Sequence, residues 1–273
     1  MVSAGTVYST EFQSWKRSLG PLLDAAGLKE RINSSVGTIL VKPNLVEALL
    51  PPITTPAGLI EALVVYLQAM TDARIIIGEG SGAMHYETWH CFQELGYTEL
   101  ARKLGVELVD LNEAELVLLK KNECRRWPEM YLPRLAFDSF LISVPVLKAH
   151  TLAGVTLTLK NMMGLAPPSH YRQGSSWKKS AFHDRIQDAV ADLNRYRTPD
   201  FTLLDATVGM SEAHLCGPTC DPPVNKLAAG YDPVAIDSYG TGLLRKNWKD
   251  IGHIRSLHGE LGTAEPLDVI EVR

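Results

Sequence analysis

The sequence predicts an α/β fold: a mostly parallel, doubly wound sheet in three layers, with a small hairpin or edge insertion. One observation is a set of short apolar runs rich in β-branched residues, such as 38–41 and 140–144, that end at polar residues or proline. Another is the helical spacing of apolar residues between such runs, as at Leu59, Leu63 and Leu67. Strands that alternate with amphipathic helices are typical of a parallel sheet covered on both faces.

The first half of the chain supplies the alternating part of this pattern. Pro43 keeps Lys42 out of helical geometry, so the first strand ends there. Thr55 is expected to cap the next helix, with Pro56 at its first position. The expected elements are a strand at 38–41, a helix at 56–70, a strand at 74–77, a helix at 87–104 and a strand at 106–109.

The second half begins with an expected hairpin and contains one ambiguous segment. Within 146–165, apolar residues alternate with polar ones as in a strand, yet a helix also fits. Residues 174–180 are polar, and we interpret them as a loop in which Lys178 and Lys179 are solvated. The expected elements are hairpin strands at 115–119 and 131–135, a strand at 140–144, a helix at 185–196, a strand at 201–204, helices from Asp232 to about Leu261, and a last strand at 267–272.

Length and composition limit the class of protein. The 273 residues, 45% of them hydrophobic, predict one α/β domain over 1–273 with a possible small lobe within 111–137. The net charge of -4 argues against a nucleic-acid partner, and no apolar run approaches the length of a membrane span. Four scattered cysteines predict a reducing compartment, so we expect a cytoplasmic protein.

Polar side chains follow the ends of several predicted strands, where open α/β sheets bind their ligands. Lysine and asparagine side chains suit a carboxylate or a phosphate, and a histidine suits proton transfer. The sequence therefore predicts an enzyme, or a protein derived from one, that binds a small anionic molecule. The predicted catalytic residues are His150, Lys148 and Lys160; the predicted ligand-binding residues are Lys42, Asn44, Glu79, Ser81, Asn161, Asp205 and Asp232.

Four motifs carry a resemblance to a known family. They are Val41-Lys42-Pro43-Asn44-Leu45, the segment from Val146 to Leu165, Asp205-Ala206-Thr207-Val208-Gly209-Met210, and the segment from Ala228 to Asp237. Together they resemble the family catalogued as domain of unknown function 362, from about Thr38 to about Leu244. The resemblance implies a doubly wound α/β fold, and its pattern falls on Lys42, Asn44, Lys148, His150, Lys160, Asn161, Asp205 and Asp232. Many relatives carry a ferredoxin-like module, but this chain lacks its Cys-x-x-Cys run.

A fainter likeness is to the nickel-pincer lactate racemases. That family has a glycine-rich segment with a lysine that anchors the cofactor, followed by a histidine metal ligand. The stretch from Gly154 to Gly164 with Lys160, followed by His170 or His183, is similar in outline. The two glycines that usually precede the lysine are replaced here by Thr158 and Leu159. The sequence by itself identifies no cofactor.

Three alternative functions stay open. A metal-linked or iron–sulfur-linked redox protein would carry metal on purification, and its metal-ligand candidates are His170, His183, Cys216 and Cys220. A dinucleotide-binding protein would use the turn from Gly78 to Ala83, with Asp110 on the ribose, although we favour ordinary turn glycines as the explanation of that turn. A non-catalytic scaffold is favoured if Lys42, Lys148 and Lys160 lie far apart in the fold.

Overall fold

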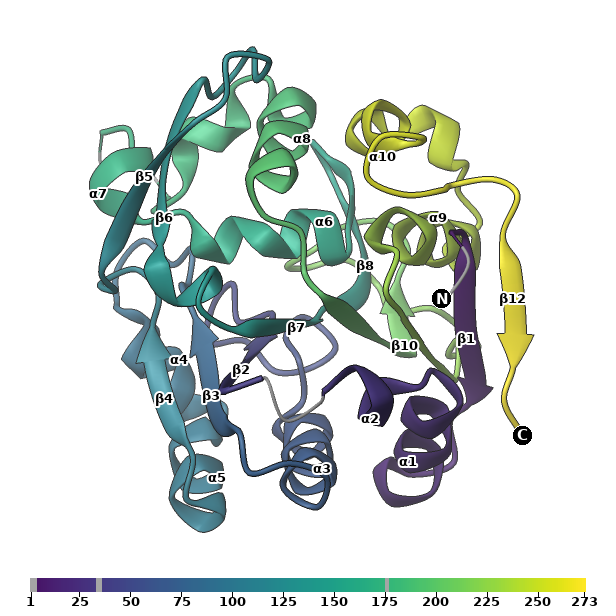
Figure 1. The fold of residues 1–273 in the computed structure, drawn as a ribbon. Helices are drawn as coiled ribbons and strands as arrows, with labels where there is room; N and C mark the ends of the chain where they lie inside the picture. The colour runs from purple at the N-terminus through teal and green to yellow at the C-terminus, as the bar shows by residue number, and fades with distance from the viewer. Residues whose placement is uncertain (1–3, 33–35, 175–176) are drawn as a thin grey trace.

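One mixed, mostly parallel sheet crosses the whole molecule (Figure 1). The computed structural model describes residues 4–32, 36–174 and 177–273. Within them ten strands form this sheet, which confirms the predicted α/β class. Its main path runs β12 (Asp268–Glu271), β1 (Thr6–Glu11), β11 (Lys226–Gly230), β10 (Phe201–Met210), β7 (Phe140–Val144), β2 (Thr38–Pro43), β3 (Arg74–Glu79) and β4 (Glu107–Asp110). β8 (Val146–His150) branches off this path to pair with β10 and with β9 (Gly154–Thr156).

Helices cover both faces of the sheet, so the fold has three layers (Figure 1). Each face has its own apolar core, one centred on residues such as Leu63 and Phe92 and the other on residues such as Leu159 and Val190. The first face carries α1 (Trp15–Ala25), α2 (Leu28–Arg31), α3 (Ala57–Gln68), α4 (Thr88–Glu94) and α5 (Tyr97–Leu104). The second carries α6 (Thr158–Asn161), α7 (Pro168–Tyr171), α8 (Ile186–Tyr196), α9 (Pro233–Leu243) and α10 (Gly252–Leu257). Short 3-10 turns lie at Arg134–Ala136, Met162–Leu165, Ser180–His183 and Trp248–Asp250.

The predicted hairpin is present and forms a separate two-stranded sheet. Its strands are β5 (Leu116–Lys120) and β6 (Glu129–Pro133), which pair antiparallel. Met130 and Leu132 of β6 are fully buried in the same core as α8. The hairpin therefore packs onto the second face of the main sheet, where Figure 1 places it.

Several elements differ from the sequence-based expectation, each for a local reason. The helix expected over 87–104 is two helices, because Gly96 adopts a left-handed φ of 78° between α4 and α5. The strand expected to end at Leu204 continues as β10 to Met210. The ambiguous segment 146–165 is β8 and β9 followed by α6, so the strand pattern holds only to Thr156. The sequence analysis missed β1, α1, α2 and β11.

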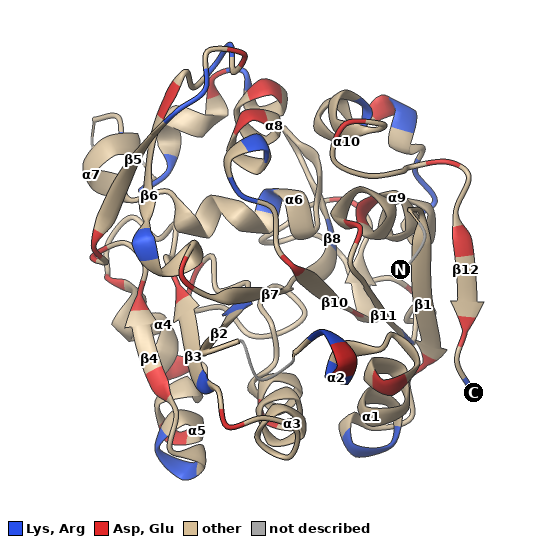
Figure 2. Cartoon of the chain, viewed as in Figure 1, with Lys and Arg blue, Asp and Glu red and all other residues tan. Residues whose placement is uncertain are grey.

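Charged residues are distributed over the outer helices and strands. Figure 2 shows Lys and Arg interspersed with Asp and Glu on α1, α2 and α8. Among the described residues, no helix combines the length and the apolar character that crossing a bilayer requires.

Candidate functional site

Two adjoining cavities lie beyond the carboxyl ends of β2, β3 and β8. The inner chamber has a volume of about 60 Å³ and the outer chamber about 320 Å³. Lys160, Lys179, Met163 and His214 line both chambers, so the two form one continuous cavity. This is the position at which open α/β sheets bind ligands, because loops diverge there from neighbouring strands.

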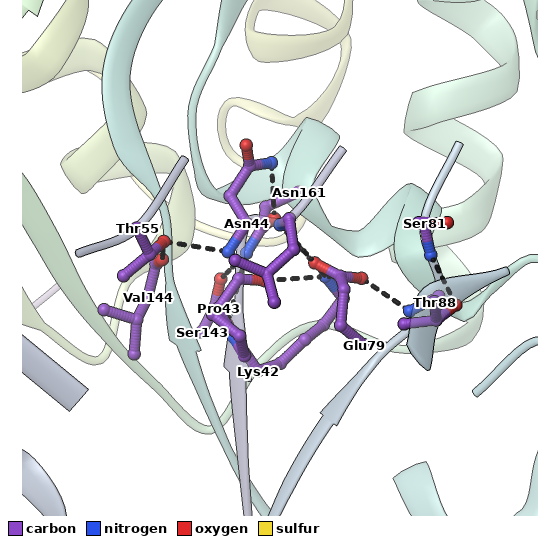
Figure 3. A network of polar contacts seen from close by, with 12 residues as sticks. Lys42, Pro43, Asn44, Thr55, Glu79, Ser81, Thr88, Ser143, Val144 and Asn161 are labelled. Carbon is purple, nitrogen blue, oxygen red and sulfur yellow. Dashed lines mark hydrogen bonds and ion pairs between the residues drawn. The ribbon is translucent and has the colours of Figure 1, made fainter. Parts of the chain in front are cut away.

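A buried ion pair forms the floor of the inner chamber (Figure 3). Lys42 Nζ at the end of β2 donates to Glu79 Oε1 at 2.8 Å and to Oε2 at 3.0 Å, from the neighbouring strand β3. Both side chains are almost completely excluded from solvent. The backbone N–H groups of Leu45 and Gly80 also donate to the Glu79 carboxylate. These bonds offset the cost of burying the two charges, and they fix the exits of β2 and β3 relative to each other.

Two asparagines extend this network from Lys42 to Lys148. Asn161 Oδ1 accepts from Lys42 Nζ at 3.3 Å and from Asn44 Nδ2 at 2.9 Å (Figure 3). Asn44 Oδ1 in turn accepts from Lys148 Nζ at 3.0 Å. The residues come from β2, α6 and β8, which are far apart in the sequence. Five predicted site residues, Lys42, Asn44, Glu79, Lys148 and Asn161, thus form one hydrogen-bonded network.

Two glycines allow the backbone to approach this network closely. A Cβ atom at Gly164 would lie 2.0 Å from Glu79 Oε1 and 2.5 Å from Lys42 Nζ. A Cβ atom at Gly80 would lie 2.4 Å from the carbonyl oxygen of Gly164. No side chain fits at either position, so residues 162–165 pack directly on the ion pair.

Lys160 reaches the cavity from α6, a short helix whose first two residues are held in place by α8 and α9. The buried Asp237 of α9 accepts from the backbone N–H of Thr158 at 2.7 Å and of Leu159 at 3.0 Å. Asn194 of α8 donates to the carbonyl oxygen of Leu159 at 2.8 Å. Sequence analysis missed Asp237 and Asn194 as supporting residues. Asp237 lies in the segment from Ala228 to Asp237, one of the motifs that carry the family resemblance. That membership was the one feature of the sequence that could have pointed to Asp237.

Lys179 is a site residue that the sequence analysis misassigned. Lys178 and Lys179 were expected to be solvated, but both are buried, with 3% and 5% of their surfaces exposed. Lys179 Nζ donates to Asn112 Oδ1 and to the carbonyl oxygen of Ala166, and the side chain lines both chambers. The residues do lie in a loop, but the expectation that water solvates Lys179 was wrong, because buried acceptors bind its amine instead. Ser175 and Ser176 of that loop lie outside the described residues.

The cavity contains more positive than negative charge. Lys148, Lys160 and Lys179 line the inner chamber, and Glu79 is the one carboxylate among the described residues that line it. Glu79 is already paired with Lys42. Burial, together with the charge of Lys160, lowers the pKa of Lys148 to about 7. Burial also lowers the pKa of Lys160 to about 8 and that of Lys179 to about 7. An anion in the chamber would therefore stabilise all three ammonium groups.

Two stacked histidines form part of the outer chamber. The rings of His150 and His214 lie 3.9 Å apart between centroids, at 19° to each other. His150 Nδ1 accepts from the backbone N–H groups of Leu152 and Ala153, each at 3.1 Å, so the ring proton lies on Nε2. Burial and the charge of Lys160 hold the pKa of His150 well below its usual range. His150 is therefore a fixed, neutral hydrogen-bond donor, which favours a binding role over the proton-transfer role expected from the sequence.

Buried polar atoms in the cavity also lack partners. Thr156 Oγ1 and His214 Nδ1 have no hydrogen-bond partner among the described residues. Thr156 lines the inner chamber and His214 lines both. The remaining wall of the outer chamber is mostly apolar, with Leu152, Met163 and Trp177. Unpaired buried polar groups are costly and are usually satisfied by a ligand or water.

Four predicted ligand-binding residues do not line the cavity: Lys42, which lies in the ion pair with Glu79, and Asp205, Asp232 and Ser81. Asp205 lies inside β10, where its Oδ1 accepts from the backbone N–H and the hydroxyl of Thr207. Asp232 is the N-cap of α9, and it also accepts from Gly5 N and Thr263 N. The backbone N–H of Ser81 donates to Thr88, and its hydroxyl is buried without a hydrogen-bond partner in the described chain. Asp205 and Asp232 therefore have structural roles that their position after a strand does not reveal.

The four metal-ligand candidates do not converge. His183 lines the outer chamber, whereas the exposed His170 stacks on Tyr131 with ring centroids 4.0 Å apart. Cys216 is exposed, and Cys220 lies beside Gly209 at the wall of a separate pocket. Across residues 4–32, 36–174 and 177–273, no three His, Cys, Asp or Glu side chains form a group that could hold a metal ion.

The turn from Gly78 to Ala83 does not have the geometry of a dinucleotide fingerprint. That fingerprint opens directly into a helix, but α4 begins only at Thr88. Gly80 packs against Gly164, and Asp110 accepts from Thr88 Oγ1 at 2.7 Å. The glycines serve the close packing of the chain itself.

One solved structure supports the fold assignment. No curated protein matches the sequence. The lactate racemase apoprotein from Thermoanaerobacterium thermosaccharolyticum is similar, with a TM-score of 0.50 and 14% identity over 90% of this chain and 57% of that one. A crystal structure of a protein from Thermotoga maritima matches with a TM-score of 0.43 and 14% identity over 82% of this chain and 58% of that one. The first match agrees with the fainter likeness seen in the sequence, and it shows a shared fold.

The family assignment comes from a family model. The model described as domain of unknown function (DUF362) matches residues 39–242, which is most of the chain. The match spans β2 to α9, and hence all the network residues described above. The chain therefore belongs to the DUF362 family.

Proposed function

We propose that the cavity binds a small molecule through a carboxylate or phosphate group. The observation that carries this proposal is the charge of the inner chamber, which is lined by the buried Lys148 and Lys179, the half-buried Lys160 and one carboxylate that is already paired. Burial, with a smaller contribution from neighbouring lysines, lowers the pKa of Lys148 and Lys179, so these amines lose part of their protonation. An anionic group would restore the charge balance and accept their remaining N–H donors.

The outer chamber would hold the rest of the ligand. Its apolar wall and neutral histidines suit an uncharged, partly apolar body. Lysines with pKa values of about 7 and 8 can accept or donate a proton near neutral pH, so proton transfer would fall to them. The convergence of Lys148 and Lys160 on one chamber speaks against the scaffold alternative.

The test measures sulfate binding by titration calorimetry, because the charge of sulfate is constant near neutral pH. Lys148→Met removes one donor and keeps the apolar stem, so we expect sulfate affinity to fall at least about tenfold, the equivalent of one lost charge-assisted hydrogen bond. Lys246→Met is the matched control, since that lysine is exposed just beyond the C-terminal end of α9 and lines neither chamber.

The same titration should be run with phosphate, acetate and malonate, to distinguish a phosphate site from a carboxylate site. Circular dichroism of each variant establishes that the fold is retained. Equal sulfate affinity in the wild type and in Lys148→Met would refute the proposed site.

A further inference from the structure

Lys160 differs from the other amines of the cavity in having no partner. Lys42 is bonded to Glu79, Lys148 to Asn44 Oδ1 and the carbonyl oxygen of Ile53, and Lys179 to Asn112 and the carbonyl oxygen of Ala166. These contacts fix three of the four amines as hydrogen-bond donors. For Lys160 Nζ, the described part of the chain provides neither a hydrogen bond nor an ion pair. Its amine is therefore available to a ligand.

The position of Lys160 is well defined although its amine is free. The backbone before it is anchored by Asp237 and Asn194, as described above. The side chain lines both chambers, so its amine lies where a ligand would pass from one to the other. A group held at this junction would contact the amine directly.

The conditions for a nucleophilic lysine are met at this position. A nucleophilic amine must be neutral, and burial away from water favours the neutral form. With a pKa of about 8, about a tenth of the Lys160 amine is neutral at pH 7. The fixed lysines would hold an anion beside it, which would place the adjoining atoms of the ligand at the amine. Thr156 Oγ1, buried and unpaired in the same chamber, can donate to an oxygen atom there.

We propose that Lys160 forms an imine with a small 2-oxo acid or aldehyde acid whose carboxylate is bound by Lys148 and Lys179. This proposal rests on the anion site proposed above and adds a covalent step to it. The amine nitrogen attacks the carbonyl carbon, a C–N bond forms, and the proton of the amine passes to the carbonyl oxygen. Loss of water then breaks the C–O bond and leaves the imine. The step needs no oxidant or reductant.

The experiment traps the imine with a reductant supplied in the assay. The full-length protein is incubated with glyoxylate or pyruvate and sodium cyanoborohydride, and labelled lysines are identified by peptide mass spectrometry. We expect one reduced adduct at Lys160, formed at least ten times faster than any adduct at the exposed Lys246. Added sulfate should slow the labelling of Lys160 and leave that of Lys246 unchanged.

Variants separate this proposal from the anion site. Lys160→Met should abolish the fast adduct and retain sulfate binding through Lys148 and Lys179, and Lys148→Met should slow the adduct at Lys160. If sulfate binds but Lys160 is labelled no faster than Lys246, the imine proposal is wrong and the anion site stands. If Lys160 is labelled fast but sulfate does not slow the labelling, then sulfate and the carboxylate of the oxo acid do not bind at the same site, and the proposal is contradicted.

Discussion

Glu79 is the counter-charge of a lysine that has no access to water. Replacing it by glutamine leaves the Lys42 ammonium buried against a neutral amide. Removal of one partner of a buried ion pair costs about 3–5 kcal/mol, so we expect Glu79→Gln to lower the free energy of unfolding in urea by that amount.

The double variant Lys42→Met/Glu79→Gln is the control for this prediction. It removes the uncompensated charge and should recover most of the lost stability, because an apolar replacement of a buried pair is often neutral. A double variant that is less stable than Glu79→Gln would mean that Lys42 stabilises the fold through contacts other than its charge.

Single residues were predictable where their position in a strand determines their surroundings. Lys42, Asn44 and Glu79 lie at or just after the carboxyl ends of the neighbouring parallel strands β2 and β3. Their position at the same edge of the sheet could therefore be predicted from sequence order alone. Lys179 could not be predicted, because its solvation by Asn112 and Ala166 depends on packing between distant segments. Asp205 misled the analysis because β10 continues six positions beyond Leu204 to Met210.

At the scale of elements, the turn Met162–Leu165 depends on the lack of a side chain at Gly164. Gly164→Ala would place a methyl group against the Lys42–Glu79 pair, and the atoms it meets are buried and hydrogen-bonded. We expect a loss of about 2–4 kcal/mol in the free energy of unfolding, in the range of overpacking combined with a broken buried network. The measurement is urea denaturation followed by circular dichroism.

Gly242→Ala is the matched control for this substitution. Gly242 is an exposed residue of α9, and a Cβ atom there would meet nothing within 4 Å. Alanine is the better helix former by up to about 1 kcal/mol, so Gly242→Ala should stabilise the protein. Similar effects of the two substitutions would contradict the proposed role of the close contact at Gly164.

Elements with a single clear period were predicted well. β2, β3, β7 and α8 agree with the sequence to within two residues at each end. The segment around Thr156 was ambiguous because the chain changes there from strand to helix, and Asp237, about 80 residues later in the chain, stabilises the first turn of α6. Such a contact carries no local signal in the sequence.

For the molecule as a whole, the buried amines make stability depend on pH. The pKa values of Lys148 and Lys179 are about 7 and that of Lys160 about 8, against 10.5 for a free lysine. Between these values the unfolded chain binds more protons, so the contribution of these amines to stability rises with pH above about pH 7, by up to about 1.4 kcal/mol per pH unit for each amine. Burial raises the pKa of Asp237 to about 8, so below that pH this carboxyl makes stability fall as pH rises. The three lysines together outweigh this single group.

The measurement is the thermal midpoint from pH 7 to pH 9 in buffers free of sulfate, phosphate and carboxylates. Above this window the buried thiol of Cys91, with a pKa raised by burial from 9.0 to about 12, lowers stability because it ionises only in the unfolded chain. Lys160→Met should show a shallower rise than the wild type. A midpoint in the wild type that falls across the window would contradict the pKa values of the three lysines.

The amine of Lys160 also has an evolutionary consequence. Replacement of Lys160 by an apolar residue removes a charge in the cavity and leaves no hydrogen-bond acceptor of the described chain unpaired, so the change would raise stability at neutral pH. Replacement of Lys148 or Lys179 would leave buried acceptors without a donor. A laboratory population selected for heat resistance alone should therefore discard Lys160 early, whereas descent under a requirement for activity would retain it.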